Sequence, residues 1–548
     1  MKVLVSWSLA VPMILGVAHA ATVTVTVTGD LVAVDGAVTL REALASINGG
    51  ADLNADVVAI GAYGTDDRIE FVIPGAGVQT LQPGSSLPAL AVPMTIDGYT
   101  QPGASPNTQA ASDDAVLLIE LDGSNAGIGA DGLRIDAGGS GSEIRGLVIN
   151  RFAFDPMTGG GNGIVIAADE CVIAGNFIGT DAAGGAALGN GDEGVAVGPG
   201  STDNLIGGSS PADRNLIAGN LSRGVIVTNA ADNVIRGNFI GVDAAGMAAV
   251  PNNVGIVVAG DDAAGNVIGG AAAGEGNVVS GNTFDGIFLA SGPNTTEIRG
   301  NFIGTDAAAL APVPNGRDGV RIESFGVPCN ANTIGGLQPE RANVIAFNLG
   351  NGINMVGPAD NLSNTIRGNR IFANGLLGID LGGDGPTLND PGDGDTGHNN
   401  LQNYPVLDSA VSMAGSTTIT GTLDSAAPNA PFLVSFHASS ACDPSGFGEG
   451  ETYLGFDTVL TDGAGIGPIA TVLPVEVPPG WFVTAVASVS DPTGDSSEFS
   501  PCIATPGGPG ALEIPALGPL GLLALCAALA AAAIVALRQR SAGARSAV

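Results

Sequence analysis

A glycine followed by alternating aliphatic residues recurs along the chain from Gly132 to about Gly382. Successive repeat glycines lie 30 to 33 residues apart. A fixed period in this range is typical of a solenoid, in which each repeat packs only against its neighbours. The eight clearest repeats begin at Gly132, Gly163, Gly194, Gly224, Gly255, Gly286, Gly319 and Gly352.

Each period also holds two short apolar segments headed by asparagine, which brings the number of strands per repeat to three. Alternation shows which way a strand faces. In the repeat at Gly319, the charged side chains are Arg321 and Glu323, so their aliphatic neighbours Val320 and Ile322 point inward. Three strands per turn with one apolar face and no helical pattern between them predict a parallel β-helix.

The recurring asparagines and glycines have a structural explanation. Sharp turns between strands require backbone angles that glycine adopts freely and asparagine tolerates. Asparagines at equivalent positions, such as Asn204, Asn266 and Asn332, are also expected to form ladders of side-chain hydrogen bonds along the stack. We therefore interpret them as turn and ladder residues and not as ligands.

The N-terminal part of the chain carries two further signals. Residues 1–20 have an early lysine, an apolar run and an Ala-x-Ala site, which together predict a secretory signal peptide. Residues 21–67 hold an alternating strand and then an amphipathic helix, with Thr39 as N-cap and Glu42 three residues later. Such a helix is expected to cover the open end of the β-helix, which we place at residues 68–407.

The pattern of apolar and polar residues changes after the last repeat. Residues 408–504 contain short alternating runs separated by turn signals, which predict a small antiparallel, immunoglobulin-like β-sandwich. Cys442 and Cys502 are the two cysteines in this segment, and in an exported domain we expect them to form a disulfide.

The C-terminal part of the chain predicts a linker and a membrane segment. Residues 505–513 are rich in proline and glycine, and residues 514–548 contain an apolar stretch long enough to span a bilayer, closed by arginines. The short motif Ile514, Pro515 and Leu517 before this stretch resembles the IPTL-type C-terminal sorting signals of Gram-negative bacteria, with alanine in place of threonine. That resemblance implies recognition by a membrane sorting protease; a plain membrane anchor is the alternative.

Charge restricts the classes of partner. The chain carries 53 acidic against 18 basic residues, a formal net charge of −35, and Lys2 is its only lysine. Such a surface repels nucleic acid, anionic lipid and polyanionic sugars such as pectin. It suits divalent cations and neutral or cationic partners.

Several segments resemble a known architecture. Leu40-Arg-Glu-Ala43 is similar to part of the Cys-Ser-Leu-Arg-Glu-Ala signature of bacterial surface proteins, although this chain has Val38 and Thr39 before it. The segments starting at Thr95, Ile119, Ile144, Gly175 and Gly300 resemble the right-handed β-helix repeats of the same proteins. The resemblance covers about residues 39–407 and implies a right-handed β-helix, but little about activity.

Parallel β-helices often cleave polysaccharides, so enzymatic chemistry is one hypothesis. Chemistry of the pectate-lyase type needs carboxylates near an arginine base with help from lysine, and we find no cluster of acids around an outward arginine in adjacent coils. Hydrolysis of the polygalacturonase type needs paired aspartates with a histidine and a lysine. Outside the signal peptide the histidines are His398 and His437, and neither lies in a Gly-His-Gly context. We therefore favour a protein without catalytic residues.

Glycan binding is an alternative use of the outer surface. Phe177, Phe239 and Phe302 are two coils apart, about 9.6 Å, which suits stacking on sugars of an extended polysaccharide. Arg236 and Arg299 occupy outward positions in the preceding strand. However, each phenylalanine precedes a long loop, and a loop folded over the ring would keep it dry.

An acidic, glycine-rich segment follows the last repeat. Asp384, Asp390, Asp393 and Asp395 offer closely spaced oxygen ligands, which suits calcium. A solvated acidic turn is the alternative.

These observations favour an exported protein of the cell envelope or surface of a Gram-negative bacterium, or a secreted one. We expect a non-catalytic scaffold or adhesin whose partner is a polysaccharide or another surface protein. The alternative is a polysaccharide-active β-helix enzyme: a lyase, a glycoside hydrolase or an epimerase.

Overall fold

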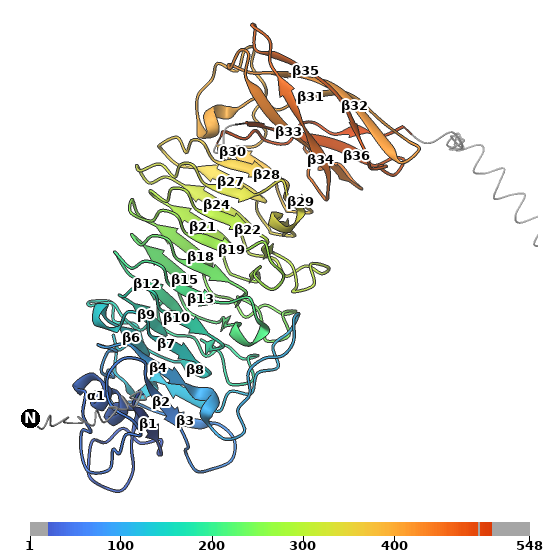
Figure 1. Ribbon diagram of the computed structural model, residues 1–548. Helices are drawn as coiled ribbons and strands as arrows, with labels where there is room; N and C mark the ends of the chain where they lie inside the picture. Colours follow the sequence, from blue (N-terminus) through green and yellow to red (C-terminus); the bar gives the residue numbers. More distant parts are fainter. Residues whose placement is uncertain (1–19, 491–493, 507–548) are drawn as a thin grey trace, which may run out of the picture. The chain divides into compact units, whose positions relative to one another are not determined.

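Short strands follow one another around a coil, and each strand pairs with its counterpart one coil further along (Figure 1). The computed structural model describes residues 20–490 and 494–506. The strand pairs between coils are parallel and in register, so the fold is the predicted right-handed parallel β-helix, followed by an antiparallel sandwich. Of the described residues, those up to Thr505 form one compact unit.

Three long parallel sheets build the β-helix. The first sheet contains β1 (Thr22–Val25), β2 (Asp67–Phe71), β4 (Met94–Asp97), β7 (Glu143–Arg145), β10 (Val172–Ala174), β13 (Leu205–Gly207), β16 (Val234–Arg236), β19 (Val267–Gly269), β22 (Glu297–Arg299), β25 (Thr333–Gly335) and β28 (Thr365–Arg367). The second sheet contains β3 (Gln79–Leu81), β5 (Ile119–Asp122), β8 (Leu147–Asn150), β11 (Phe177–Ile178), β14 (Leu216–Ile217), β17 (Phe239–Ile240), β20 (Val278–Val279), β23 (Phe302–Ile303), β26 (Val344–Ala346) and β29 (Arg370–Phe372).

The third sheet starts at each repeat glycine. It contains β6 (Leu133–Ile135), β9 (Ile164–Ile166), β12 (Val195–Val197), β15 (Arg223–Thr228), β18 (Val254–Ala259), β21 (Ile287–Ala290), β24 (Val320–Glu323), β27 (Ile353–Val356) and β30 (Ile379–Leu381). Its last strand, β30, belongs to a coil that the sequence repeat did not reveal, because the glycine before it, Gly378, follows the previous repeat glycine after only 26 residues.

Inward aliphatic side chains fill the bore of the coil. Val225, Ile256 and Ile287 are register partners in β15, β18 and β21, and all three are fully buried. Equivalent residues of successive coils therefore stack directly on one another, and each coil buries the apolar face of the next.

Buried asparagines form ladders parallel to this stack. In the longest ladders, each Nδ2 donates to the Oδ1 one coil further along at 2.9–3.2 Å and also to a backbone carbonyl. One ladder contains Asn176, Asn215, Asn238, Asn277, Asn301, Asn343 and Asn369; a second contains Asn190, Asn220, Asn252, Asn282, Asn315, Asn348 and Asn374. None of these fourteen has a positive φ, so they hold neighbouring coils together and do not supply left-handed turns.

The expected ladder through Asn204, Asn266 and Asn332 is interrupted. Asn204 connects to Asn266 through Asn233, but the next coil has Thr296 at this position. The backbone N–H of Thr296 donates to Asn332 Oδ1 at 2.9 Å, so a side-chain ladder resumes only there.

Helix α1 (Leu40–Gly49) packs at the first coil. Thr39 is its N-cap, and Thr39 and Glu42 exchange hydrogen bonds in a capping box. The buried side chains Leu44 and Ile47 join the core formed by β1 and β2. The helix therefore covers apolar surface that no earlier coil is present to bury.

The C-terminal domain has two antiparallel sheets (Figure 1). One contains β31 (Val406–Met413), β32 (Ser416–Asp424) and β35 (Ile466–Leu473), and the other contains β33 (Pro431–Ser439), β34 (Thr452–Leu460), β36 (Phe482–Val489) and β37 (Ile503–Ala504). Inward side chains of both sheets, such as Ile419 and Phe436, share one core.

This domain also provides hydrogen-bond partners and apolar contacts for the last coil of the β-helix. Backbone groups of Ile371 and Gly450 form two hydrogen bonds. Two glutamates accept further N–H groups of the coil: Glu449 accepts from residues 373 and 374, and Glu498 accepts from residues 381 and 387, at 2.8–3.2 Å. Phe499 inserts into the apolar core of the β-helix. The sandwich thus supplies the contacts that a further coil would make.

Asn238→Ala is expected to lower the free energy of unfolding by about 1–3 kcal/mol, because the backbone N–H and Nδ2 of Asn215 lose an acceptor and the Ile206 carbonyl loses a donor. Chemical denaturation measures the change. Asn253→Ala removes an exposed side chain and serves as the control. Equal stability of the two variants would contradict a structural role for the ladder.

Burial raises the pKa of both Glu449 and Glu498 from 4.5 to about 7. A raised pKa means that the folded protein binds these protons more tightly than the unfolded chain does. Their stabilising contribution is therefore complete below about pH 4.5 and is lost as the pH rises through about 7. We expect the melting temperature to fall over this interval and the fall to be shallower in Glu449→Gln with Glu498→Gln.

Glu340→Gln, at an exposed glutamate, is the matched control and should keep the wild-type slope. Identical slopes in the double variant and the wild type would show that the buried pair does not control the pH dependence.

Candidate functional site

Polar side chains gather on the outer face of the third sheet, in its last coils. Arg321, Asn354 and Asp380 are consecutive register partners in β24, β27 and β30, and all three side chains point outward. Because the sheet is parallel and in register, residues of three separate repeats stand side by side on a rigid surface.

A second polar row precedes the same strands. Asp285, Asp318 and Asn351 each occupy the position just before a repeat glycine, and all are at most 3% exposed. The backbone N–H of Asp318 donates to Asp285 Oδ1 at 3.2 Å, and the N–H of Asn351 donates to Asp318 Oδ1 at 2.9 Å. Each member therefore fixes the next, as in the asparagine ladders.

The two rows are joined by hydrogen bonds between side chains. Asp318 Oδ2 accepts from Arg321 Nη1 at 3.0 Å and from Asn354 Nδ2 at 2.9 Å. Asn351 Nδ2 donates to Asp380 Oδ2 at 3.3 Å. Asn351 therefore bridges Asp318 and Asp380, the first through its backbone and the second through its side chain.

One acceptor in this network has no partner. Asn354 is 6% exposed, and its Oδ1 is buried without a hydrogen bond within the described part of the chain. A buried acceptor left unpaired costs about 1–3 kcal/mol. A ligand that donates a hydrogen bond here would remove this cost.

Two carboxyl groups at the site have raised pKa values. Burial raises the pKa of Asp285 to about 6, although Arg317 opposes the shift. Burial also raises the pKa of Asp380 above its ordinary value, against hydrogen bonds from backbone N–H groups and Asn351. A carboxyl group with a raised pKa can hold a proton and deliver it to a bound molecule.

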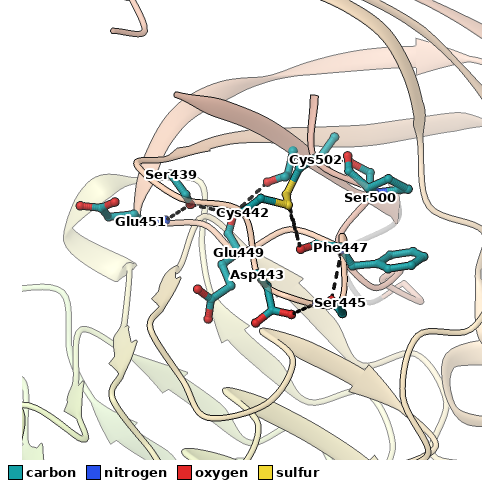
Figure 2. Close-up of a disulfide and its surroundings, with 12 residues drawn as sticks. Ser439, Cys442, Asp443, Ser445, Phe447, Glu449, Glu451, Ser500 and Cys502 are labelled. Atoms are coloured by element: carbon teal, nitrogen blue, oxygen red, sulfur yellow. Dashed lines mark hydrogen bonds between the residues drawn. A yellow bond between two sulfur atoms is a disulfide. The ribbon is translucent and has the colours of Figure 1, made fainter. Parts of the chain in front are cut away.

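Asp318, Arg321, Asn351, Asn354 and Asp380 line a groove of about 760 Å³. Its other wall is the segment Asp443, Pro444 and Ser445, which follows β33 in the sandwich. Figure 2 shows this segment next to the disulfide, with Ser445 N–H donating to Asp443 Oδ1 at 2.8 Å. The predicted disulfide between Cys442 and Cys502 is confirmed, and it ties the wall of the groove to the end of the sandwich.

The expectation that no outward arginine has acids around it in adjacent coils is wrong. Arg317 contacts Asp285 of the preceding coil at 3.0 Å and lies 3.9 Å from Asp318 of its own coil, and Arg321 contacts Asp318 at 3.0 Å and Glu323 at 2.7 Å. The signal was present in the sequence: Arg321, Asn354 and Asp380 all lie two residues after a repeat glycine. The 26-residue step to Gly378 hid the third of these positions.

Two of the rings expected to meet a glycan are buried. Phe177 and Phe239 lie two coils apart in the second sheet, and each is only 2% exposed. The loops after them fold back and pack alanine and valine side chains over the rings, and the Arg214 guanidinium lies 4.2 Å above the ring of Phe239. Sugars therefore cannot stack on these two rings. Phe302 is half-buried in the same cluster.

The arginines assigned to the same surface are paired with acids. Arg236 contacts Glu275 at 2.6 Å, and Arg299 pairs with Glu297. These pairs neutralise both guanidinium groups, which end the first-sheet strands β16 and β22.

Three of the four predicted calcium ligands are adjacent. Asp390, Asp393 and Asp395 each place an oxygen within 4.8 Å of the others, so this cluster could hold a metal ion. Asp384 is not a member; it is exposed and lines the groove. Burial raises the pKa of both Asp393 and Asp395.

The terminal signals lie outside the described residues. Residues 1–19 of the predicted signal peptide and the motif Ile514, Pro515 and Leu517 fall there. Among residues 20–490 and 494–506, we find no helix with the length and apolar character needed to cross a bilayer.

No protein-family model and no curated protein match the chain. Solved structures do match. A mutant of the periplasmic alginate epimerase AlgG is 13% identical, with 57% of this chain covering 60% of that one and a TM-score of 0.28. The chain thus spans less than two thirds of that protein. Dettilon tailspike protein gp208 is 14% identical, with coverage of 85% and 92% and a TM-score of 0.35. The A-module of mannuronan C-5 epimerase AlgE6 from Azotobacter vinelandii is 12% identical, with coverage of 56% and 90% and a TM-score of 0.30.

These similarities have TM-scores of 0.28 to 0.35. The groove is the finding that bears on function, because the side chains of Asp318, Arg321, Asn351, Asn354 and Asp380 converge in it. This convergence contradicts the expectation of a non-catalytic scaffold or adhesin. The alternative, a polysaccharide-active enzyme, agrees better with it.

Proposed function

We propose that this protein is an exported glycoside hydrolase that binds a polysaccharide in the groove on β24, β27 and β30. The proposal depends mainly on one observation: carboxyl groups of two different coils, Asp318 and Asp380, lie in one groove and are bridged by Asn351. Paired carboxyl groups at a groove are the minimum machinery for cleaving a glycosidic bond.

The two carboxyl groups have different surroundings. Asp380 has no basic partner within the described residues, and burial raises its pKa, so it suits the role of the acid that protonates the leaving oxygen. Asp318 accepts hydrogen bonds at both oxygens, including one from Arg321, so it suits the role of the charged carboxylate that assists water or the sugar ring. Such a division of roles between two carboxyl groups is how one site supplies both acid and base.

Hydrolysis fits this groove better than elimination or epimerisation. Those reactions remove the proton beside a sugar carboxylate, and they need a free cation to stabilise the negative charge that forms. Both arginines of the groove are already bound to aspartates or a glutamate. The one lysine of the chain is Lys2.

Two aromatic residues, Phe288 and Phe325, form a surface that we call the aromatic ledge and that suits a sugar ligand. Phe288 is the register partner of Arg321 one coil away, and its ring packs edge to face with Phe325 at 6.4 Å. Phe325 nevertheless remains 62% exposed. Exposed aromatic rings beside a polar groove offer a surface for the apolar face of a sugar.

The proposed location is the cell envelope or surface. Export by the signal peptide at residues 1–20 agrees with the Cys442–Cys502 disulfide, since disulfides persist in oxidising compartments. The resemblance of residues 514–517 to IPTL-type signals implies handling by a membrane sorting protease in a Gram-negative bacterium. The similarity of residues 40–43 to the surface-protein signature agrees with this assignment.

Calcium at Asp390, Asp393 and Asp395 is a further part of the proposal. Among the described residues, Asp395 Oδ1 is buried without a hydrogen-bond partner, and the same holds for Oδ1 of Asp424, whose Oδ2 accepts from Gly392 N–H at 3.1 Å. Buried carboxylate oxygens without donors are suitable ligands for a hard cation. The ion would stabilise the connection between β30 and the sandwich.

Asp380→Asn is expected to reduce kcat on the polysaccharide by about 100-fold or more, because an amide cannot donate the proton to the leaving oxygen. Release of reducing ends from a panel of soluble neutral, cationic and anionic polysaccharides measures activity. Asp262→Asn, at an exposed turn, should keep full activity. Wild-type rates in Asp380→Asn would exclude this acid, and no cleavage of any polymer by the wild type would exclude hydrolysis.

Calcium is expected to raise the melting temperature relative to EDTA, with a stabilisation of about 2.7 kcal/mol at 100 times Kd. Asp395→Asn should abolish the shift, whereas Asp262→Asn should retain it. Differential scanning calorimetry with and without calcium makes the comparison. A shift of the same size in Asp395→Asn would place any bound calcium elsewhere.

A further inference from the structure

Charge in the groove is unbalanced. The charged residues that line it are four aspartates, Asp318, Asp380, Asp384 and Asp443, and two arginines, Arg317 and Arg321, so four acids minus two bases leave a formal charge of −2.

Both arginines are committed to partners. Arg317 Nε contacts Asp285 Oδ1 at 3.0 Å, and Arg321 contacts Asp318 at 3.0 Å and Glu323 at 2.7 Å. An anionic group of a ligand would have to displace one of these carboxylates to reach a guanidinium.

The remaining aspartates are uncompensated. Within the residues that the structure describes, Asp380, Asp384 and Asp443 have no arginine or histidine within ion-pair distance. They come from two separate parts of the chain, β30 with the loop after it and the segment after β33. They therefore face the groove from both of its walls.

An independent observation indicates a hydrogen-bond donor. Asn354 lines the same groove, is more than nine-tenths buried, and has an Oδ1 atom without a partner. An acceptor in this position is satisfied by an N–H or O–H group and is repelled by a carboxylate.

We propose that the groove binds a glycan with free amino groups, a polymer of unacetylated amino sugars, and excludes polyuronates. The inference rests on the proposed function, because it names the substrate class of the same groove. Ammonium groups of the sugar would face Asp384 and Asp443, and one donor would reach Asn354 Oδ1. Opposite charges across a contact favour the correct partner, and like charges disfavour the wrong one.

The aromatic ledge favours a polymer over a small amine. Phe288 is the register partner of Arg321 in the neighbouring coil, and Phe325 follows β24, the strand that carries Arg321. A ligand that contacts both the aromatic ledge and the acids needs charged substituents on a ring with an apolar face. A polymer of amino sugars has both the ring and the charged substituents.

Binding of three hexasaccharides to the mature chain distinguishes the substrate classes: hexaglucosamine, its fully N-acetylated form and hexagalacturonate. Isothermal titration calorimetry at low and moderate salt is the measurement. We expect hexaglucosamine to bind at least tenfold more tightly than the neutral hexamer, with an affinity that falls as salt rises. We expect no binding of hexagalacturonate. Equal affinity for the neutral hexamer, or binding of hexagalacturonate, would overturn the proposal.

The net charge of −35 attracts any polycation, so a matched control is needed. Asp384→Asn with Asp443→Asn should weaken hexaglucosamine binding about tenfold, whereas Asp261→Asn with Asp262→Asn, at an exposed turn, should leave it unchanged. Hexalysine should bind both double variants equally. A parallel loss of hexalysine and hexaglucosamine binding in the groove variant would reduce the effect to charge alone and overturn the proposal.

The substrate class and the reaction can fail separately. Selective binding of hexaglucosamine without cleavage of any amino-sugar polymer would leave the substrate class standing and exclude hydrolysis. Cleavage of a polyuronate would support hydrolysis and overturn the substrate class.

Discussion

Stacking of each coil on the next is the interaction on which the rest of this structure depends. Val225, Ile256 and Ile287 show it in the bore, where each aliphatic side chain is buried only because the neighbouring coils are present. The asparagine ladders make the stack specific, because a slip of one coil against another would leave buried amides without partners. Hydrophobic burial and polar pairing therefore favour the same register.

A stacked coil has two open ends, and this chain closes them differently. Helix α1 buries the core of the first coil with an amphipathic face. At the other end, Glu449 and Glu498 accept backbone N–H groups that a further coil would otherwise satisfy. The second solution brings the sandwich segment at Asp443 beside the third sheet, so the closure of the β-helix also builds one wall of the groove.

The candidate site uses the rigidity of the stack. Asp318, Asn351 and Asp380 are positioned by strands and by a polar ladder, which holds them more firmly than loops would. Other side chains considered as glycan contacts already have partners within the protein. Arg236 is paired with an acid, and Phe239 lies under a loop and the Arg214 guanidinium. Within the residues that the structure describes, the groove in contrast contains acids on both walls without a basic partner and the unpaired Asn354 oxygen.

Much of the architecture follows from local patterns in the sequence. The glycine period, the inward alternation at Val320 and Ile322 and the Thr39 cap each have a short-range signal, because periodicity and capping are properties of neighbouring residues. The pair Cys442 and Cys502 followed from composition, since the segment holds two cysteines.

The site depends on distant residues. Asp318 and Asp380 are 62 residues apart, and they meet because the last coil closes after only 26 residues and the sandwich holds it in register. The lengths of the loops within a coil, and the packing of the sandwich on the last coil, decide which side chains become neighbours. These are tertiary properties, and no local pattern contains them.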